Sequence, residues 1–347
     1  MTRKNDNIIQ IPLVALRGLT VFPNMILHFD VARPKSIKAL EESMIKGEPI
    51  FLVAQKDAEI EDPNIDDIYS VGTISNIKQI LKLPNNTIRV LVEGDKRGRI
   101  ISFKQKEPFF LVYIEKEDTD KKANNGKVTT KALVRLAAET FEDYAKLNNR
   151  LSSDTVNNII SMDKPGEMAD AICSNIQLKL EVKQQILSEF DEKDRLIMLI
   201  EILKSEIEIM QVQKEILEII EAEQYRQGGL FLPSDSDSYL AKISLHAELI
   251  THQEGESCLG FCFFYCNAED KQASYITLIG TSRAARGKGV GYGLLQHVLA
   301  VTRQRGFSSC QLEVRKANHE AFLFYQKAGF SILEDRGEKY LMEISAR

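Results

Sequence analysis

The residues from Ser282 to Gln296, SRAARGKGVGYGLLQ, place four glycines beside Arg286 and Lys288 at the start of a segment with helical periodicity. An apolar stretch, Ala273–Thr281, comes directly before them. Each glycine weakens a helix by about 1 kcal/mol relative to alanine, so the glycines need another explanation. The first amides of a helix have no intrahelical partner, the helix dipole favours an anion there, and glycine lets a ligand approach the backbone. The pattern therefore predicts a site for phosphate or pyrophosphate.

Two common phosphate-binding loops do not fit this stretch. A Walker A loop fails because Ser282 stands at the position of its first glycine and Gly289 follows Gly287-Lys288. A dinucleotide-binding fingerprint that starts at Gly287 fails at Tyr292. The remaining pattern, Arg286-x-x-Gly289-x-Gly291, resembles the acyl-CoA loop of the GNAT acetyltransferases. The resemblance extends over about residues 238–341 and includes QLEVRKANHEAFLFYQKAGF.

The GNAT resemblance implies transfer of an acetyl group from acetyl-CoA to an amine, by direct attack and without a metal. It implies that one strand end pairs with the pantetheine amides, through Ile279, Gly280 and Thr281. It implies that the loop amides hold the pyrophosphate, through Arg286, Gly287, Lys288, Gly289, Val290 and Gly291. Asn318 would contact the cofactor, Tyr325 would protonate the leaving thiolate, and Glu313 is a candidate general base.

Each of these side chains also has a structural interpretation. Tyr325 could be a core aromatic, and Glu313 could be a structural partner on a strand; Tyr275 could position the substrate or relay its proton. Cys258, Cys262 and Cys266 recur every four residues and would share one face of a strand. That spacing matches no familiar zinc pattern, so we expect buried thiols rather than a metal site.

The usual first strand of the GNAT fold has no counterpart in the sequence, because a long predicted helix comes almost directly before YLAKISLHA. A second hypothesis therefore stays open, in which the chain is a non-catalytic binding or adaptor protein with a degenerate GNAT domain. Titration of acetyl-CoA together with a thiol-release assay separates the two hypotheses.

The first part of the chain carries a different resemblance. IPLVALRGLTVFPNMILHFDVARPKSIKAL and the segments up to about residue 216 resemble the N-terminal domain of the Lon protease family. The resemblance implies a small β-barrel, a helical bundle and a long exit helix, and a domain that binds unfolded polypeptide. A scaffold without a ligand is the alternative. We expect neither protease nor ATPase activity, because no Walker A loop is present and the chain is too short for both catalytic domains.

The sequence thus predicts a multidomain fusion protein. Its parts are a β-rich Lon-type subdomain, a helical Lon-type subdomain with a long exit helix, and an α/β GNAT domain with a mixed sheet, at residues 1–117, 118–227 and 230–347. A polar stretch, Glu115–Lys127, is the predicted linker between the first two, and Gly228-Gly229 ends the long helix.

The composition of the chain limits the classes of partner that we expect. The net charge of -5 gives no electrostatic reason to bind nucleic acid, and no apolar run is long enough to span a membrane. Five cysteines without a secretory signal indicate reduced thiols in the cytoplasm. The expected acceptor is an amine on a small molecule, a protein N-terminus or a lysine.

Overall fold

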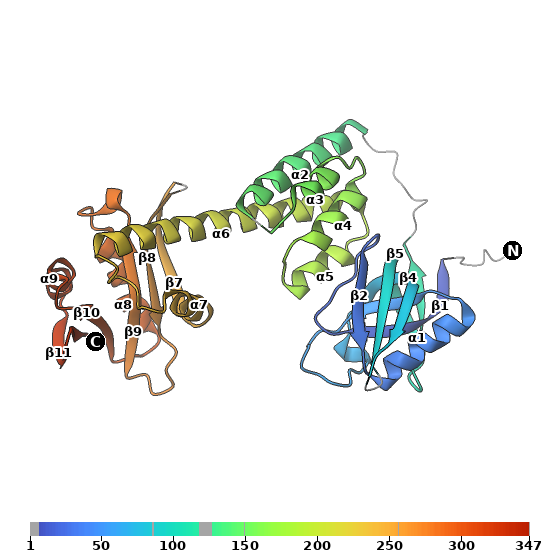
Figure 1. The fold of residues 1–347 in the computed structure, drawn as a ribbon, viewed down its shortest axis with the longest axis horizontal. Helices are drawn as coiled ribbons and strands as arrows, with labels where there is room; N and C mark the ends of the chain where they lie inside the picture. Colours follow the sequence, from blue (N-terminus) through green and yellow to red (C-terminus); the bar gives the residue numbers. More distant parts are fainter. Residues whose placement is uncertain (1–6, 85–86, 118–126, 149, 256, 347) are drawn as a thin grey trace. The chain divides into compact units, whose positions relative to one another are not determined.

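The computed structural model of the 347-residue chain describes residues 7–84, 87–117, 127–148, 150–255 and 257–346 (Figure 1). It forms two compact units, Met1–Ile207 and Glu208–Arg347, which divide within helix α6 (Glu192–Arg226). The sequence predicted a boundary at Gly228-Gly229, but the division comes earlier along the chain. The reason is that Ile216, Ile219 and Ile220 of α6 belong to an apolar cluster of the second unit. The predicted linker lies mostly outside the described residues.

The first unit begins with a six-stranded sheet in the order β2-β5-β4-β3-β1-β6. The long strand β5 also pairs with β6, and this pairing closes the sheet into a barrel. Helix α1 starts at a proline, which suits a first helical position, and ends at Gly47 in the left-handed conformation. The elements are β1 (Ile8–Leu16), β2 (Ile26–Val31), α1 (Pro34–Lys46), β3 (Ile50–Ala54), β4 (Val71–Lys82), β5 (Ile88–Gln105) and β6 (Phe110–Lys116).

A helical subdomain completes the first unit, so the predicted barrel-plus-bundle architecture is confirmed. Its helices bury apolar side chains at helical spacing, including Phe141, Leu196, Leu199 and Leu203. The elements are α2 (Lys127–Leu147), α3 (Ser153–Ile160), α4 (Pro165–Asn175), α5 (Leu180–Ser188) and the first half of α6.

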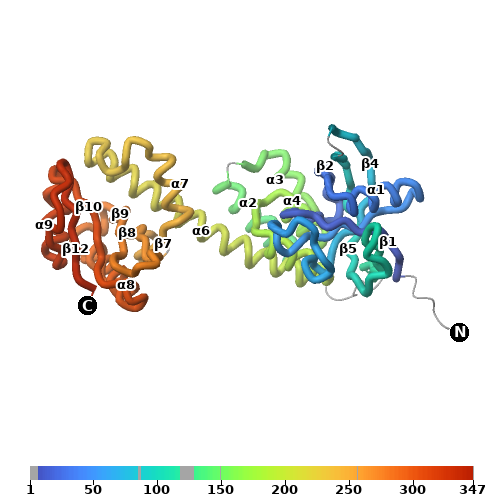
Figure 2. Tube along the Cα trace, turned by 90° about the horizontal axis from the view of Figure 1, so that it is seen from below, coloured from blue at the N-terminus to red at the C-terminus, as the bar shows by residue number. Residues whose placement is uncertain are grey.

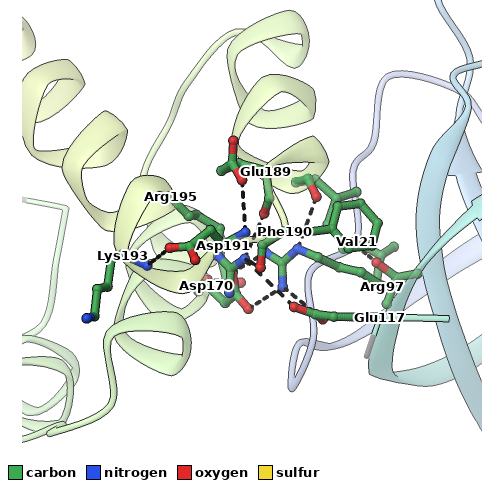
Figure 3. A network of polar contacts seen from close by, with 12 residues as sticks. Val21, Arg97, Glu117, Asp170, Glu189, Phe190, Asp191, Lys193 and Arg195 are labelled. Carbon is green, nitrogen blue, oxygen red and sulfur yellow. Dashed lines mark hydrogen bonds and ion pairs between the residues drawn. The ribbon is translucent and has the colours of Figure 1, made fainter. Parts of the chain in front are cut away.

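A buried ionic network joins the barrel to the helices within this unit (Figure 3). The guanidinium of Arg97 on β5 donates to both carboxylate oxygens of Asp170 on α4, and its Nε donates to the carbonyl of Leu187 at 3.0 Å. Arg195 of α6 lies 3.4 Å from the same carboxylate, and Glu117 lies 4.0 Å from each guanidinium. Because both arginines are almost fully buried, removal of the carboxylate would leave uncompensated charge in the interior.

The second unit is a mixed six-stranded sheet in the order β11-β12-β10-β9-β8-β7, which confirms the predicted GNAT-type sheet. Only β9 and β10 run parallel among its described pairs. Its elements after α6 are α7 (Ser236–His246), β7 (Glu248–Glu254), β8 (Ser257–Tyr265), β9 (Ala273–Thr281), α8 (Val290–Gln304), β10 (Ser309–Arg315), α9 (His319–Lys327), β11 (Ser331–Arg336) and β12 (Lys339–Ser345).

Helices cover both faces of this sheet (Figures 1 and 2). Phe261 and Phe263 of β8 pack in one apolar cluster with the second half of α6 and with α7. Leu294, Leu295 and Val298 of α8 pack in a second cluster, on the side of the sheet that also carries Phe264. The sheet therefore has two apolar faces, and the end of α6 is part of the fold of this unit. None of the described helices combines the length and apolar character that crossing a membrane requires.

Candidate functional site

The two parallel strands at the centre of the second sheet separate at their carboxyl ends. Paired residues run only from Ser309 opposite Ala273 to Leu312 opposite Ile276, although the strands continue to Arg315 and Thr281. Two cavities lie at the unpaired ends, one of about 550 Å³ and one of about 470 Å³. Beyond Ile276, β9 therefore has no strand partner on its β10 side, although Ile279 and Gly280 still pair with β8 on the other side.

The glycine-rich loop connects β9 to α8 as the sequence predicts. A short 3₁₀ turn at Arg283–Ala285 leads to Gly287 and Gly289, both of which have positive φ, and Gly289 is the N-cap of α8. A side chain at Gly291 would put its Cβ 3.4 Å from the ring of Phe324. The first-turn amides of α8 lack intrahelical partners, so the loop has the backbone donors that an anion needs.

The first cavity gathers most of the predicted cofactor residues. Ten of the predicted site residues are among those that line it: Ile279, Gly280, Thr281, Arg286, Gly287, Gly289, Val290, Gly291, Asn318 and Tyr325. Lys288 does not line it, and Glu313 lines the second cavity instead. Asn318 is also the N-cap of α9, because its side chain accepts from the amide of Ala321 at 3.1 Å.

Tyr325 lies where the two cavities meet, because it lines both of them. The residue is 7% exposed, and its ring packs beside Phe324 and Phe330. Burial raises the pKa of the phenol well above its ordinary value, so Tyr325 keeps its proton at neutral pH. It is thus both a core aromatic and a potential proton donor at the junction.

Glu313 is held by two cations. Its carboxylate lies 2.9 Å from Nη1 of Arg336 and 2.8 Å from Nζ of Lys339. The hydrogen bond from Lys339, together with that from Arg336, lowers the pKa of the carboxyl. A carboxylate with a lowered pKa is a weak proton acceptor, so this geometry favours the structural interpretation of Glu313 over the general-base interpretation.

Tyr275 also lines the second cavity, where it is half-buried. Burial, with a contribution from the nearby charge of Glu313, raises the pKa of Tyr275 to about 12. The neutral phenol can orient a substrate by donating a hydrogen bond, as the sequence interpretation allowed.

The last turns of α6 contribute side chains that the sequence interpretation missed. Glu223 is 5% exposed and pairs with Arg286 of the glycine-rich loop. Gln227, directly after the helix, accepts from Nδ2 of Asn318 at 3.1 Å and donates to Glu223 at 3.1 Å. Arg226 pairs with Glu223 at 2.9 Å and with Glu320 at 2.8 Å. Two predicted cofactor contacts, Arg286 and Asn318, are thus bonded to the end of the long helix.

The sequence predicts that the usual first strand of the GNAT fold is missing. The described residues from Glu208 to Ala247 form only α6, a loop and α7. The edge of the sheet is β7. The second cavity nevertheless has a wall opposite the sheet, because Leu230, Phe231, Pro233 and other residues of the α6–α7 loop line it. The lining of the second cavity therefore does not depend on the missing strand.

Cys258 and Cys262 of β8, and Cys266 directly after it, do not share one face, so that prediction was wrong. Cys258 packs in the cluster beneath α6, whereas Cys262 and Cys266 pack in the cluster beneath α8. The ladder between β7 and β8 shifts register between His252 and Gln253, and this irregularity reverses the alternation. Among the described residues, no group of three or more His, Cys, Asp or Glu side chains could hold a metal ion.

Comparisons with known proteins agree with the two units. The model of the ATP-dependent protease La (LON) substrate-binding domain matches residues 10–205, and the model of the acetyltransferase (GNAT) family matches residues 214–330. A Lon protease of Clostridium acetobutylicum is 46% identical over 207 residues, which are 59% of this chain and 26% of that protein. The chain thus spans about a quarter of the length of such relatives.

Solved structures match the chain at lower similarity. The N-terminal domain of the Mycobacterium avium complex Lon protease has a TM-score of 0.46 and 18% identity, and covers 56% of this chain and 98% of its own. A GNAT family acetyltransferase from Elizabethkingia anophelis with acetyl-CoA bound has a TM-score of 0.29 and 16% identity, and covers 32% of this chain and 84% of its own. The family models carry the assignment: the chain belongs to the Lon substrate-binding domain family, and its second unit is a GNAT acetyltransferase domain.

Proposed function

We propose that the second unit transfers an acetyl group from acetyl-CoA to an amine. The observation that carries the proposal is the shared position of Tyr325, which lines both the cavity at the glycine-rich loop and the cavity on the other side of the strand opening. A thioester held in the first cavity and an amine held in the second would meet beside this phenol. The two cavities therefore provide the proximity that a direct transfer needs.

The chain's own groups fit each part of such a cosubstrate. The amides from Arg286 to Gly291, apart from that of Lys288, which donates to the carbonyl of Ala285 at 3.2 Å, suit a diphosphate, because they lead into the start of α8 across two glycines with positive φ. The unpaired end of β9 suits the amide groups of pantetheine, because its backbone lacks a strand partner on the β10 side. Acetyl-CoA supplies an activated acetyl thioester when bound.

The acid and base roles divide unequally. Tyr325 keeps its proton and is the proposed donor to the departing thiolate. Glu313 was the candidate base, but its two cationic partners lower its pKa. We therefore assign the uptake of the ammonium proton to a water molecule in the second cavity. Tyr275, which lines that cavity, would orient this water.

The test combines binding with turnover. Titration of acetyl-CoA by calorimetry should give a measurable dissociation constant, and a thiol-release assay over a panel of primary amines should give turnover that depends on both substrates. A folded protein that does not bind acetyl-CoA would overturn the proposal. Binding without turnover on any amine would favour the non-catalytic hypothesis instead.

For the first unit we propose binding of unfolded polypeptide. A cavity of about 510 Å³ at the ends of β1 and β2 is lined by apolar side chains such as Leu19 and Phe29, together with Arg17 and Arg33. Fluorescence anisotropy with one labelled protein, in its native and its permanently unfolded form, tests the proposal. Binding of the unfolded form alone is expected, and equal or absent binding of both forms would refute it.

A further inference from the structure

The second cavity of the GNAT unit has a chemical character that narrows its substrate. Three half-buried aromatic rings line it, those of Phe231, Tyr239 and Tyr275. The hydroxyl of Tyr239 donates to the carbonyl of Thr277 at 2.9 Å, which fixes this ring against β9. A volume of about 470 Å³ lies in the range of small-molecule sites. These aromatic faces can pack against an apolar body on the acceptor, while the rest of the lining is largely polar.

The charges that line this cavity are not balanced. They are one anion, Glu313, and two cations, Arg315 and Lys339. Glu313 is already paired with Lys339 and with Arg336, so it has little charge left to offer a cationic ligand. A second ammonium group on the acceptor would meet this positive surplus without a matching carboxylate.

Arg315 is the cation that can still bind a further anion. Its Nε donates to the carbonyl of Leu230 in the α6–α7 loop at 3.1 Å. Its only ion pair among the described residues is a 3.5 Å contact between Nη1 and the exposed carboxylate of Glu338. The backbone contact holds the guanidinium beside the loop, while its remaining N–H groups can donate to a planar carboxylate.

From these observations we infer that the acceptor is a small amine that has an apolar body and also carries a carboxylate, which Arg315 binds. The inference rests on the proposed acetyl transfer and names the substrate class of that site. It predicts discrimination against diamines and polyamines, because these carry additional positive charge. It also predicts discrimination against the carboxamide of the same amine, because the amide has no charge for Arg315 to bind.

A binding experiment tests the inference separately from turnover. The protein saturated with CoA is titrated with 3-phenylpropanoate and, in parallel, with 3-phenylpropanamide, two probes that cannot be acetylated on a primary amine. We expect the carboxylate to bind roughly tenfold more tightly than the amide, which is the effect of one partly exposed charge pair. Arg315→Gln should remove the difference, whereas Arg303→Gln, at a guanidinium that does not line the cavity, should preserve it.

Turnover then tests the same contact. Phenylalanine should have a higher kcat/KM than phenylalaninamide in the unchanged protein, and Arg315→Gln should lower the value for phenylalanine alone. The amine of the amide loses its proton more readily, so intrinsic reactivity works against the expected order. Equal affinity for the two non-reactive probes, or a preference that survives Arg315→Gln, would overturn the inference. Absence of thiol release with normal probe binding would instead overturn the proposed function.

Discussion

A buried carboxylate beside a predicted diphosphate site should weaken the binding of the diphosphate by electrostatic repulsion. Glu223 is such a carboxylate, and its substitution makes the repulsion measurable. Its side chain pairs with Arg286 of the glycine-rich loop and is 5% exposed. Among the side chains that line the first cavity, the two cations Arg226 and Arg286 are matched by the two anions Glu223 and Glu320. We therefore expect Glu223→Gln to tighten binding of acetyl-CoA, because glutamine can still accept from Arg286 but leaves the cavity with a net positive charge.

The size of the effect follows from the geometry. If one guanidinium separates Glu223 from the diphosphate, two unit charges about 6 Å apart repel each other by about 2.8 kcal/mol at an effective dielectric constant of about 20. The side chain of Arg286 is 37% exposed, and solvent screening reduces the net gain to about 1 kcal/mol. That free energy corresponds to a roughly fivefold lower dissociation constant for acetyl-CoA.

The assay compares two ligands and two variants by calorimetry. Acetyl-CoA should bind roughly fivefold more tightly to the Glu223→Gln protein, while S-acetylpantetheine, which lacks the diphosphate, should bind both proteins equally. Glu221→Gln makes the same charge change on an exposed residue of the same helix that lines neither cavity, and it should have little effect. Weaker binding of acetyl-CoA to Glu223→Gln would refute the reasoning, because it would mean that the carboxylate mainly positions Arg286.

Three further predictions concern single side chains. Tyr325→Phe should lower kcat by roughly 10²-fold and leave the dissociation constant of acetyl-CoA nearly unchanged; unchanged turnover in a steady-state assay would remove the phenol from the mechanism. Asp170→Ala should destabilise the first unit by about 3 to 5 kcal/mol in urea unfolding, because Arg97 and Arg195 would lose their shared buried partner. Burial raises the pKa of Glu117, so the folded chain holds a proton that the unfolded chain releases, and the unfolding free energy should fall as pH rises from about 4.3 through the raised value. Glu117→Gln should flatten that fall, and an identical pH profile would contradict this assignment.

The architecture of both units could be predicted from the sequence because local patterns specify it. The alternating strand Ala273–Thr281, the glycines with positive φ at 287 and 289, and the apolar face of α8 all agree with one another. The glycine-rich loop could be predicted from these patterns as an anion site at the end of a strand. The roles of Asn318 and Tyr325 instead followed from the resemblance to the GNAT family.

The contacts of α6 could not be predicted in the same way. An apolar seam along a long helix predicts packing, but not which neighbour it packs against, so Ile219 and Ile220 could not be assigned to the second unit. The pairing of Glu223 with Arg286 depends on that docking, as does the contact of Gln227 with Asn318. The partners of Glu313 come from the β11–β12 hairpin, whose register is a property of the folded sheet.

The claim on which the account depends is that the backbone from Arg286 to Gly291 binds the diphosphate of coenzyme A. The most direct measurement is a calorimetric comparison of CoA with pantetheine, which shares its thiol and amides but lacks the diphosphate and nucleotide. We predict that the unchanged protein binds CoA at least roughly tenfold more tightly than pantetheine, since charge-assisted bonds to several amides contribute only with CoA. Equal affinity for the two ligands, or no affinity for either, would contradict the claim.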